Sequence, residues 1–138
     1  TSIAYKDFAH SPSKLKATTK AVKEQYNDRI LVACLELHTY SSLNAEFLKE
    51  YKGALDAADV AVVFYSPHAV EIKKLQEVTE VQIANAFQRD DLIIYTNPED
   101  FTTFLCSQNF DNKSLLLMSS GNYGGLDFDE VEKLLRTQ

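Results

Sequence analysis

Short apolar runs alternate with amphipathic helical patterns from one end of the chain to the other. The runs have the length of β-strands, and the second of them, Arg29 to Glu36, is apolar almost throughout, which is typical of a buried parallel strand. Five strands are predicted, over residues 2–7, 29–36, 60–65, 92–96 and 114–118. The alternation predicts an α/β fold with three layers: a Rossmann-like, open sheet of about 5–6 mainly parallel strands with helices on both faces.

Helix start signals lie between these runs. Pro12 suits the first turn of a helix over residues 12–26, because proline lacks the amide proton that would be unpaired there, and Ser11 can cap that helix. Thr79 and Gln82 have the spacing of a capping box for a short helix that ends at residue 87. Three further helices are predicted from caps and apolar stripes: Ser41 or Ser42 with Leu43, Phe47, Tyr51, Ala54 and Leu55; Asn97-Pro98 with Phe101, Phe104 and Leu105; and Asp127 with Phe128, Val131, Leu134 and Leu135.

The composition is that of an ordinary globular protein. With 138 residues, of which 45% are apolar, the chain is predicted to form a single domain over residues 1–138. No apolar run approaches the ~20 residues that span a membrane, and no signal peptide is visible, so we expect a cytoplasmic protein with no membrane partner. Cys34 and Cys106 lack pairing context and metal-ligand spacing and are predicted to be reduced core residues. Because Thr1 directly precedes a strand, we expect the chain to be part of a longer polypeptide.

The charge is acidic but unevenly distributed. A net charge of -6 argues against nucleic acid as a partner. Residues 1–29 nevertheless carry six basic and three acidic side chains. Lys16, Lys20 and Lys23 fall on one helix face, away from the apolar stripe, and could attract a phosphate-bearing substrate; a solvated outer face is the favoured interpretation.

Polar and glycine-rich chemistry follows the predicted strand ends. The histidines come just after the first three strands, and a glycine loop over residues 119–125 comes after the fifth; the residues are His10, His38, His68, Gly121, Gly124 and Gly125. Carboxyl ends of parallel strands meet at one sheet edge, where open α/β sheets bind ligands. The sequence therefore predicts a ligand crevice at this edge, although a plain turn before a helix would also explain the loop.

The segment from Asp7 to Pro12 joins the first strand to the first helix and places a carboxylate and an imidazole beside a helix N-terminus, which favours anions. An ordinary strand-to-helix turn remains the alternative. A zinc site built from the three histidines and Asp7 is disfavoured because their spacing matches no zinc motif, so no metal ligand is assigned. A G-x-x-x-x-G-K-[ST] phosphate loop and a G-x-S-x-G elbow are both absent from the sequence.

Three segments together resemble the C-terminal domain of the Mur ligases. They are Tyr5-Lys6-Asp7-Phe8-Ala9-His10-Ser11-Pro12, Leu35-Glu36-Leu37-His38-Thr39-Tyr40, and Met118-Ser119-Ser120-Gly121-Asn122-Tyr123-Gly124-Gly125. The first is similar to the family's D-[YF]-[AG]-H-x-P segment, the second to its second-strand exit, and the third to its glycine loop. The residues of the first and third segments are most similar to those of family members that recycle the murein tripeptide, and the L-alanine-adding members are near neighbours.

The resemblance implies a three-domain enzyme whose other two domains hold the UDP-sugar and, through a phosphate loop, ATP with Mg²⁺. Such enzymes join UDP-N-acetylmuramate to an amino acid or short peptide through an acyl phosphate. By this resemblance Asp7 would bind the ATP ribose and His10 would be catalytic, near the phosphates. The residues that would seat the amine-bearing substrate are Phe8, His38, Thr39, Tyr40, Ser120, Gly121, Asn122 and Tyr123.

Departures from the family pattern keep alternatives open. Thr39 stands where alanine-adding members usually carry Arg, and Lys6 stands where many members carry a second Asp. D-x-A-H-x-P also occurs in folylpolyglutamate synthetases, which share the architecture. A stand-alone flavodoxin-like or receiver-like binding module would need an acidic cluster or a flavin-phosphate loop at the strand ends. It is disfavoured because Asp7 and Glu36 are the only acids that the sequence places there. The isolated chain, lacking a phosphate loop, is expected to be inactive.

Overall fold

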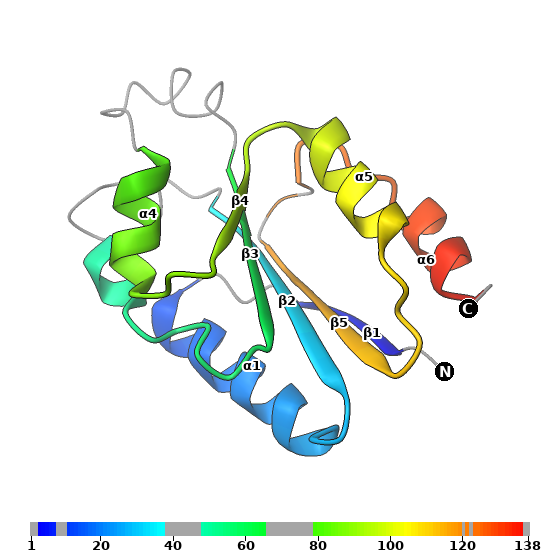
Figure 1. The fold of residues 1–138 in the computed structure, drawn as a ribbon, viewed down its shortest axis with the longest axis horizontal. Helices are drawn as coiled ribbons and strands as arrows, with labels where there is room; N and C mark the ends of the chain where they lie inside the picture. The colour runs from blue at the N-terminus through cyan, green and yellow to red at the C-terminus, as the bar shows by residue number, and fades with distance from the viewer. Residues whose placement is uncertain are drawn as a thin grey trace.

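Five strands form one parallel sheet, as predicted (Figure 1). The computed structural model describes residues 3–7, 11–37, 48–65, 79–119, 121 and 123–136. The strands are β1 (Ile3–Asp7), β2 (Ile30–Glu36), β3 (Val60–Phe64), β4 (Ile93–Tyr95) and β5 (Lys113–Met118). Their order across the sheet is β1-β5-β2-β3-β4, and every pair is parallel. The last strand in the chain therefore lies between the first two.

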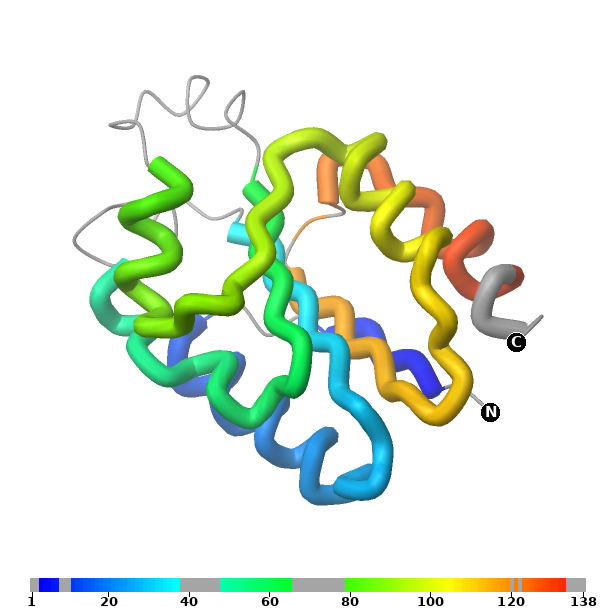
Figure 2. The backbone as a smooth tube through the Cα atoms, in the orientation of Figure 1, coloured from blue at the N-terminus to red at the C-terminus, as the bar shows by residue number. Residues whose placement is uncertain are grey.

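Helices cover both faces of the sheet, which confirms the three-layer prediction (Figures 1 and 2). The helical elements are α1 (Pro12–Gln25), the 3-10 turn η1 (Lys49–Tyr51), α4 (Glu80–Phe87), α5 (Pro98–Ser107) and α6 (Phe128–Arg136). Side chains of α1, η1 and α4 pack on one face, and side chains of α5 and α6 pack on the other.

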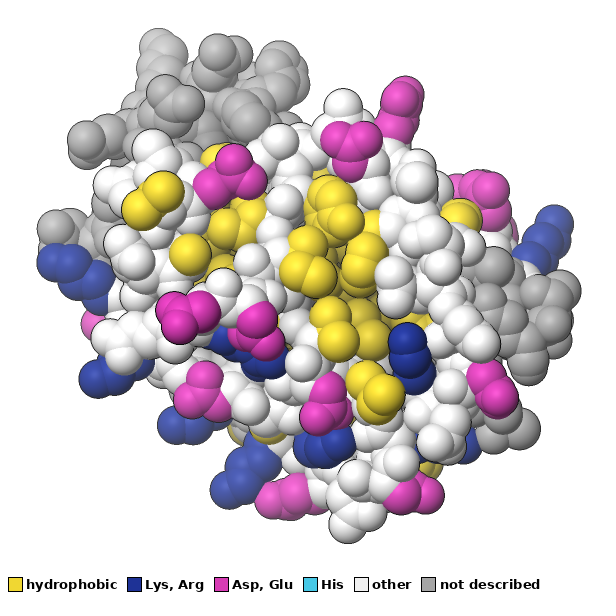
Figure 3. Space-filling view, in the orientation of Figure 1, with side chains coloured by type: hydrophobic (Ala, Val, Ile, Leu, Met, Phe, Trp, Pro, Cys, Tyr) yellow, Lys and Arg dark blue, Asp and Glu magenta, His cyan; other side chains and the backbone are white. Residues whose placement is uncertain are grey.

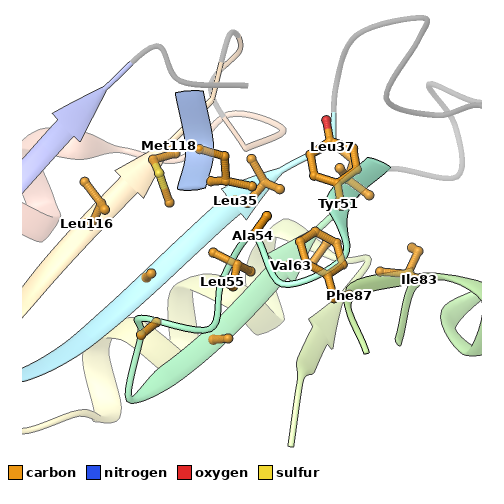
Figure 4. Close-up of a cluster of buried hydrophobic side chains, with 14 of the residues drawn as sticks. Leu35, Leu37, Tyr51, Ala54, Leu55, Val63, Ile83, Phe87, Leu116 and Met118 are labelled. Carbon is orange, nitrogen blue, oxygen red and sulfur yellow. The ribbon is translucent and has the colours of Figure 1, made fainter. Parts of the chain in front are cut away.

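The two faces have different cores. On the first, which we call the aliphatic face, the core is built mainly of leucine, valine, alanine, isoleucine and methionine (Figure 4). The second, which we call the aromatic face, centres on Phe64, Phe101, Phe110 and Tyr123. Strand residues alternate between the two, so that Leu116 contributes to the aliphatic face and Leu117 to the aromatic face.

Several predicted caps are present. Thr79 and Gln82 form the reciprocal capping box of α4, with bonds of 3.2 and 2.8 Å. The Asn97 side chain accepts hydrogen bonds from two backbone amides at the start of α5, and Asp127 does the same for α6. The Ser11 prediction is wrong in one respect, because its side chain makes no cap hydrogen bond. Pro12 starts that helix, and its missing amide proton leaves one donor fewer to satisfy.

The predicted helix with Tyr51, Ala54 and Leu55 on one stripe does not continue that far. Its start lies outside the described residues, and after η1 the chain enters turns through Gly53, which has a φ of +73°. A left-handed residue ends a helix, yet the three stripe residues are still buried. The irregular segment predicted from Ser66 also lies outside the described residues.

Two predictions about surface and core are corrected. Cys34 is buried and free as predicted, but Cys106 is exposed because it lies one residue beyond the inward-facing Leu105 of α5. Lys23 is not simply solvated: its ammonium lies 2.7 Å from a carboxylate oxygen of Asp59 and donates to the carbonyl of Arg29 at 2.8 Å. It therefore ties the end of α1 to the chain before β2 and β3.

The β4 edge of the sheet carries apolar side chains at the surface. On the side of the molecule that carries β4, hydrophobic side chains gather between α4 and α5 (Figure 3). Leu92, Ile93, Ile94 and Tyr95 are each half-buried there. Within the described residues, no helix is long and apolar enough to cross a membrane.

Candidate functional site

Neighbouring strands direct the chain to opposite sides of the sheet at its carboxyl edge. Asp7 ends β1, Glu36 ends β2 and Met118 ends β5. The helical element described after β2 packs on the aliphatic face, whereas α6, which follows β5, packs on the aromatic face. Adjacent strands whose connections diverge in this way create the crevice in which open α/β sheets bind ligands. The candidate site therefore lies where β1, β5 and β2 end.

The glycine loop after β5 is held by a buried carboxylate. Glu36, 3% exposed, accepts hydrogen bonds at one carboxylate oxygen from the Ser119 hydroxyl, at 2.5 Å, and from the Tyr123 amide, at 2.9 Å. The Gly121 amide in turn donates to the Ser119 hydroxyl at 2.7 Å. A carboxylate that accepts several donors is an effective anchor in a buried setting. Glu36 thus ties two positions of the loop, Ser119 at its start and Tyr123 within it, to the end of β2.

The Tyr123 side chain is part of the fold's interior. Its hydroxyl lies 2.8 Å from the carbonyl oxygen of Cys34 in β2 and 2.7 Å from that of Met118 at the end of β5. The single hydroxyl proton is therefore shared between these two acceptors. Its ring stacks on Phe101 with centroids 5.0 Å apart. Burial, followed by the neighbouring Cys34 and Glu36, raises the pKa of the Tyr123 hydroxyl well above its usual value. The hydroxyl therefore stays protonated and serves as a donor.

Glycine is required after this tyrosine. Gly124 has a φ of +73°, and a Cβ added there would lie 2.8 Å from Cγ of Pro98 at the start of α5. That approach is closer than real Cβ contacts allow, so a larger residue would push the loop away from α5. The glycine loop is therefore tightly packed against α5 at Gly124, whereas a Cβ added at Gly125 would meet nothing within 4 Å.

Asp7 lies beside the start of the loop. In the pairing of β1 with β5 it is opposite Met118, and its carbonyl oxygen accepts a hydrogen bond of 3.0 Å from the Ser119 amide. The residue is exposed at the sheet edge, in contrast to the buried Glu36. The structure thus brings Asp7, Gly121 and Tyr123, three predicted site residues, to the same edge.

The other predicted site residues lie outside the described part of the chain. They are Phe8, His10, His38, Thr39, Tyr40, Ser120 and Asn122. Their positions in the sequence follow β1, β2 and β5 directly. Within residues 3–7, 11–37, 48–65, 79–119, 121 and 123–136, no three histidine, cysteine, aspartate or glutamate side chains are grouped to hold a metal ion.

Sequence reasoning noted Glu36 only as an acid at a strand end and gave it no role. The available signal was a carboxylate directly closing a run of six apolar residues, because such a group is buried only when it has partners. Ser119, its main donor, was likewise passed over as the first residue of the loop.

Comparison with known proteins gives evidence about the family that is independent of the geometry of the site. A scan against protein-family models finds no match. The chain is 41% identical over 61 residues to a UDP-N-acetylmuramate–L-alanine ligase of Sulfurihydrogenibium sp., covering 44% of this chain and 13% of the relative. It is 30% identical over 132 residues to the enzyme of that name from Leuconostoc citreum, covering 94% of this chain and 27% of the relative. The chain thus spans about a quarter of the length of the curated relative that matches most of it.

Two solved structures share the fold. A murein peptide ligase of Psychrobacter arcticus superimposes with a TM-score of 0.70 at 17% identity, over 99% of this chain and 27% of that one. A UDP-N-acetylmuramate-alanine ligase of Thermotoga maritima superimposes with a TM-score of 0.63 at 13% identity, over 97% and 26%. Both comparisons place the five-stranded sheet in the same architecture.

Proposed function

On the premise that this chain is a Mur ligase C-terminal domain, as its sequence relatives and fold neighbours support, we propose that it belongs to a cytoplasmic three-domain ligase. The enzyme would join UDP-N-acetylmuramate to an amine-bearing substrate at the expense of ATP. This domain would close over the other two, which would hold the UDP-sugar and the phosphates of ATP. Closure would keep water away from the acyl phosphate, which water would otherwise hydrolyse.

The observation that carries the proposal is the position of Asp7 next to the braced glycine loop. An exposed carboxylate can accept hydrogen bonds from both hydroxyls of a ribose. The loop beside it offers a fixed backbone surface for a second ligand. One edge of the sheet can therefore serve two substrates at once, as a ligase requires.

In this proposal the substrate carboxylate takes the terminal phosphoryl group of ATP, ADP departs, and the amine then attacks the acyl carbon and releases phosphate. Asp7 binds the ATP ribose, and His10 lies near the phosphates, where a donor stabilises developing negative charge. Phe8, His38, Thr39 and Tyr40, with the loop residues Ser120, Gly121, Asn122 and Tyr123, seat the amine-bearing substrate; the Tyr123 side chain acts by holding the loop. Mg²⁺ is assigned to the central domain.

We propose the murein tripeptide, L-alanyl-γ-D-glutamyl-meso-diaminopimelate, as the amine donor. Two observations favour it: the residues of the segments around Asp7 and Gly121, and the shared fold with a murein peptide ligase. L-alanine is the second candidate, because the sequence relatives carry the name of the L-alanine ligase. A folylpolyglutamate synthetase-like domain and a flavodoxin-like binding module rank below both.

The deciding experiment measures phosphate release from ATP by the full-length protein with UDP-N-acetylmuramate. One reaction receives the tripeptide, a second L-alanine and a third no amine. Tripeptide-dependent release is the expected result, and alanine-dependent release would move the assignment to the second candidate. Release with neither would contradict the proposed function. The 138-residue chain alone should release no phosphate in any of the three reactions.

The ribose role of Asp7 has a separate test. Asp7→Ala in the full-length protein should raise the KM for ATP by about tenfold, since a hydrogen bond to a charged group is lost, while the KM for UDP-N-acetylmuramate stays within about twofold. Glu24→Gln, an exposed change in α1, is the control. An unchanged KM for ATP would remove Asp7 from the ribose site.

A further inference from the structure

We propose that Glu36 is a positioning residue: its carboxylate sets the conformation of the loop over residues 119–125 and thereby the affinity of the ligase for its amine-bearing substrate. The inference rests on the proposed function and goes beyond it, because neither the family motif nor the sequence reasoning gave Glu36 a role. Glu36 is buried and does not need to touch the substrate.

Hydrogen-bond donors of the glycine loop point toward Glu36. An open glycine loop would present its amides to a ligand, yet the Tyr123 amide and the Ser119 hydroxyl both donate to one oxygen of Glu36. The Gly121 amide is drawn in through the same serine. The acceptor for these loop donors is therefore a side chain of the protein itself, Glu36, rather than a bound ligand.

Within the described residues, the first half of the loop depends on this carboxylate more than the second half does: apart from the Ser119 amide bond to Asp7, Ser119 and Gly121 are held through Glu36. Tyr123 and Gly124 both have positive φ angles, a conformation that is costly for the tyrosine and needs outside support. The tyrosine ring is anchored in the aromatic face, but Ser119 and Gly121 have their described side-chain and loop hydrogen bonds only through the Glu36 network. Loss of the carboxylate would therefore release the first half of the loop while the tyrosine ring stays in place.

The position of Asp7, the proposed ribose ligand, does not depend on the Glu36 side chain. Asp7 is tied to this edge by β1 pairing with β5 and by the backbone bond from Ser119, neither of which involves a side chain of Glu36. Removing the Glu36 carboxylate should therefore leave the proposed ribose contact where it is. The affected region is the loop whose residues Ser119 and Tyr123 are bonded to the end of β2, where we propose that the amine-bearing substrate binds.

The test uses the full-length ligase with Glu36→Ala, Glu36→Gln and Ser119→Ala, and Glu24→Gln as a control that removes one exposed carboxylate from α1. Glu36→Ala should raise the KM for the amine donor about 10- to 100-fold, because the two hydrogen bonds that the carboxylate accepts from the loop are lost. The KM for ATP should stay within about twofold of the wild-type value. Glu36→Gln keeps one acceptor oxygen and should recover part of the loss. Ser119→Ala should show the same direction as Glu36→Ala, and Glu24→Gln should show no change.

Hydrogen exchange by mass spectrometry provides the second readout. In Glu36→Ala, peptides covering residues 119–125 should exchange faster, whereas those of β3 and α1 should match the wild type. Equal rises in the KM for ATP and for the amine donor, or unchanged exchange in the loop, would overturn the proposal, since a general loss of folding affects both substrates. If wild-type protein forms no amide with any donor, the proposed function fails and the amine seat with it; the exchange result then still decides whether Glu36 holds the loop.

Discussion

The cores on the two faces of the sheet differ in the kind of side chain that fills them and in their connection to the candidate site. On the aliphatic face, most of the buried side chains are leucine, valine, alanine, isoleucine and methionine. The aromatic pair of Tyr51 in η1 and Phe87 in α4, with ring centroids 5.2 Å apart, lies far along the chain from the glycine loop. On the aromatic face, rings contact one another from β3 across α5 to the loop: Phe64, Phe101 and Tyr123 have centroids 5.0 to 5.9 Å apart. Stacked rings have few rotamers and hold a fixed geometry.

The difference shows where the protein needs precision. Burial of aliphatic side chains stabilises the sheet without fixing any one loop. The aromatic face, in contrast, connects directly to the candidate site, because the Tyr123 ring belongs to its core and the Tyr123 amide binds Glu36. Stability and site geometry are therefore coupled on one face and separate on the other.

The largest expected effect comes from truncating a ring. Phe101→Ala should lower the free energy of unfolding by about 3–5 kcal/mol, and Leu15→Ala on the aliphatic face by about 2–5 kcal/mol, since both side chains are fully buried. Only Phe101→Ala should also speed hydrogen exchange in residues 119–125. Urea unfolding and exchange measure the two quantities. Equal loop exchange in both variants would break the contrast between the faces.

A smaller effect is expected from the tyrosine hydroxyl. Tyr123→Phe should cost about 1–2 kcal/mol at pH 7, because the hydroxyl proton shared by the carbonyl oxygens of Cys34 and Met118 is lost. Since burial raises the pKa of Tyr123 in the folded protein, its stabilising contribution is complete below the ordinary value of about 10 and is lost as the pH rises above it. The free energy of unfolding, measured with urea between about pH 9 and 11, should therefore fall less steeply with rising pH in the variant than in the wild type. Identical slopes would contradict this assignment.

The aliphatic face is also held by an ion pair, whose contribution should be modest. Burial opposes ionisation of Asp59, but hydrogen bonds from Lys23 and from the Leu31 amide outweigh it and lower the pKa of that carboxyl. The stabilisation is present above the ordinary aspartate pKa and is lost as the pH falls. Asp59→Asn should cost about 0.5–1 kcal/mol at pH 7, a value reduced for the exposure of the pair, and less near pH 3, about one unit below the ordinary pKa, where the stabilisation is already being lost. Thermal unfolding at both pH values measures this difference.

The smallest change should be neutral or favourable. Ser114 is 1% exposed in β5, and its hydroxyl has no hydrogen-bond partner within the part of the chain that the structure describes. Ser114→Ala removes an unsatisfied polar group at little cost in volume, so stability should stay equal or rise by up to about 1 kcal/mol. A loss greater than about 1 kcal/mol in urea unfolding would mean that the hydroxyl is satisfied after all.

Local features of the fold were predictable from the sequence because their signals are local. The strands agree with their predicted ranges to within one or two residues, and the caps at Thr79, Asn97 and Asp127 depend on neighbours three positions away. Cys106 was wrongly placed in the core because its residue type was weighed above its helical position, which is about 100° beyond that of the buried Leu105.

Features of the candidate site that depend on distant pairs were not predictable. Glu36 and Ser119 are 83 positions apart, and no pattern within one sequence announces that pairing. The insertion of β5 between β1 and β2 has the same origin, since alternation predicts parallel strands but not their order. The predicted contribution of the Tyr123 segment to substrate binding remains a prediction, now with the tyrosine ring assigned to the interior.

The strand order also constrains the time course of folding. Ile3 and Leu31 both pair with Ser114, so the strand that joins β1 to the rest of the sheet is a segment that leaves the ribosome after the first four strands. Until then β1 has no partner and Asp7 has no fixed place. Contacts between such distant segments slow folding, because a long loop must close before they are rewarded. The ligand edge is therefore assembled last, and a nascent or truncated chain lacking β5 would have helices and strands but no site.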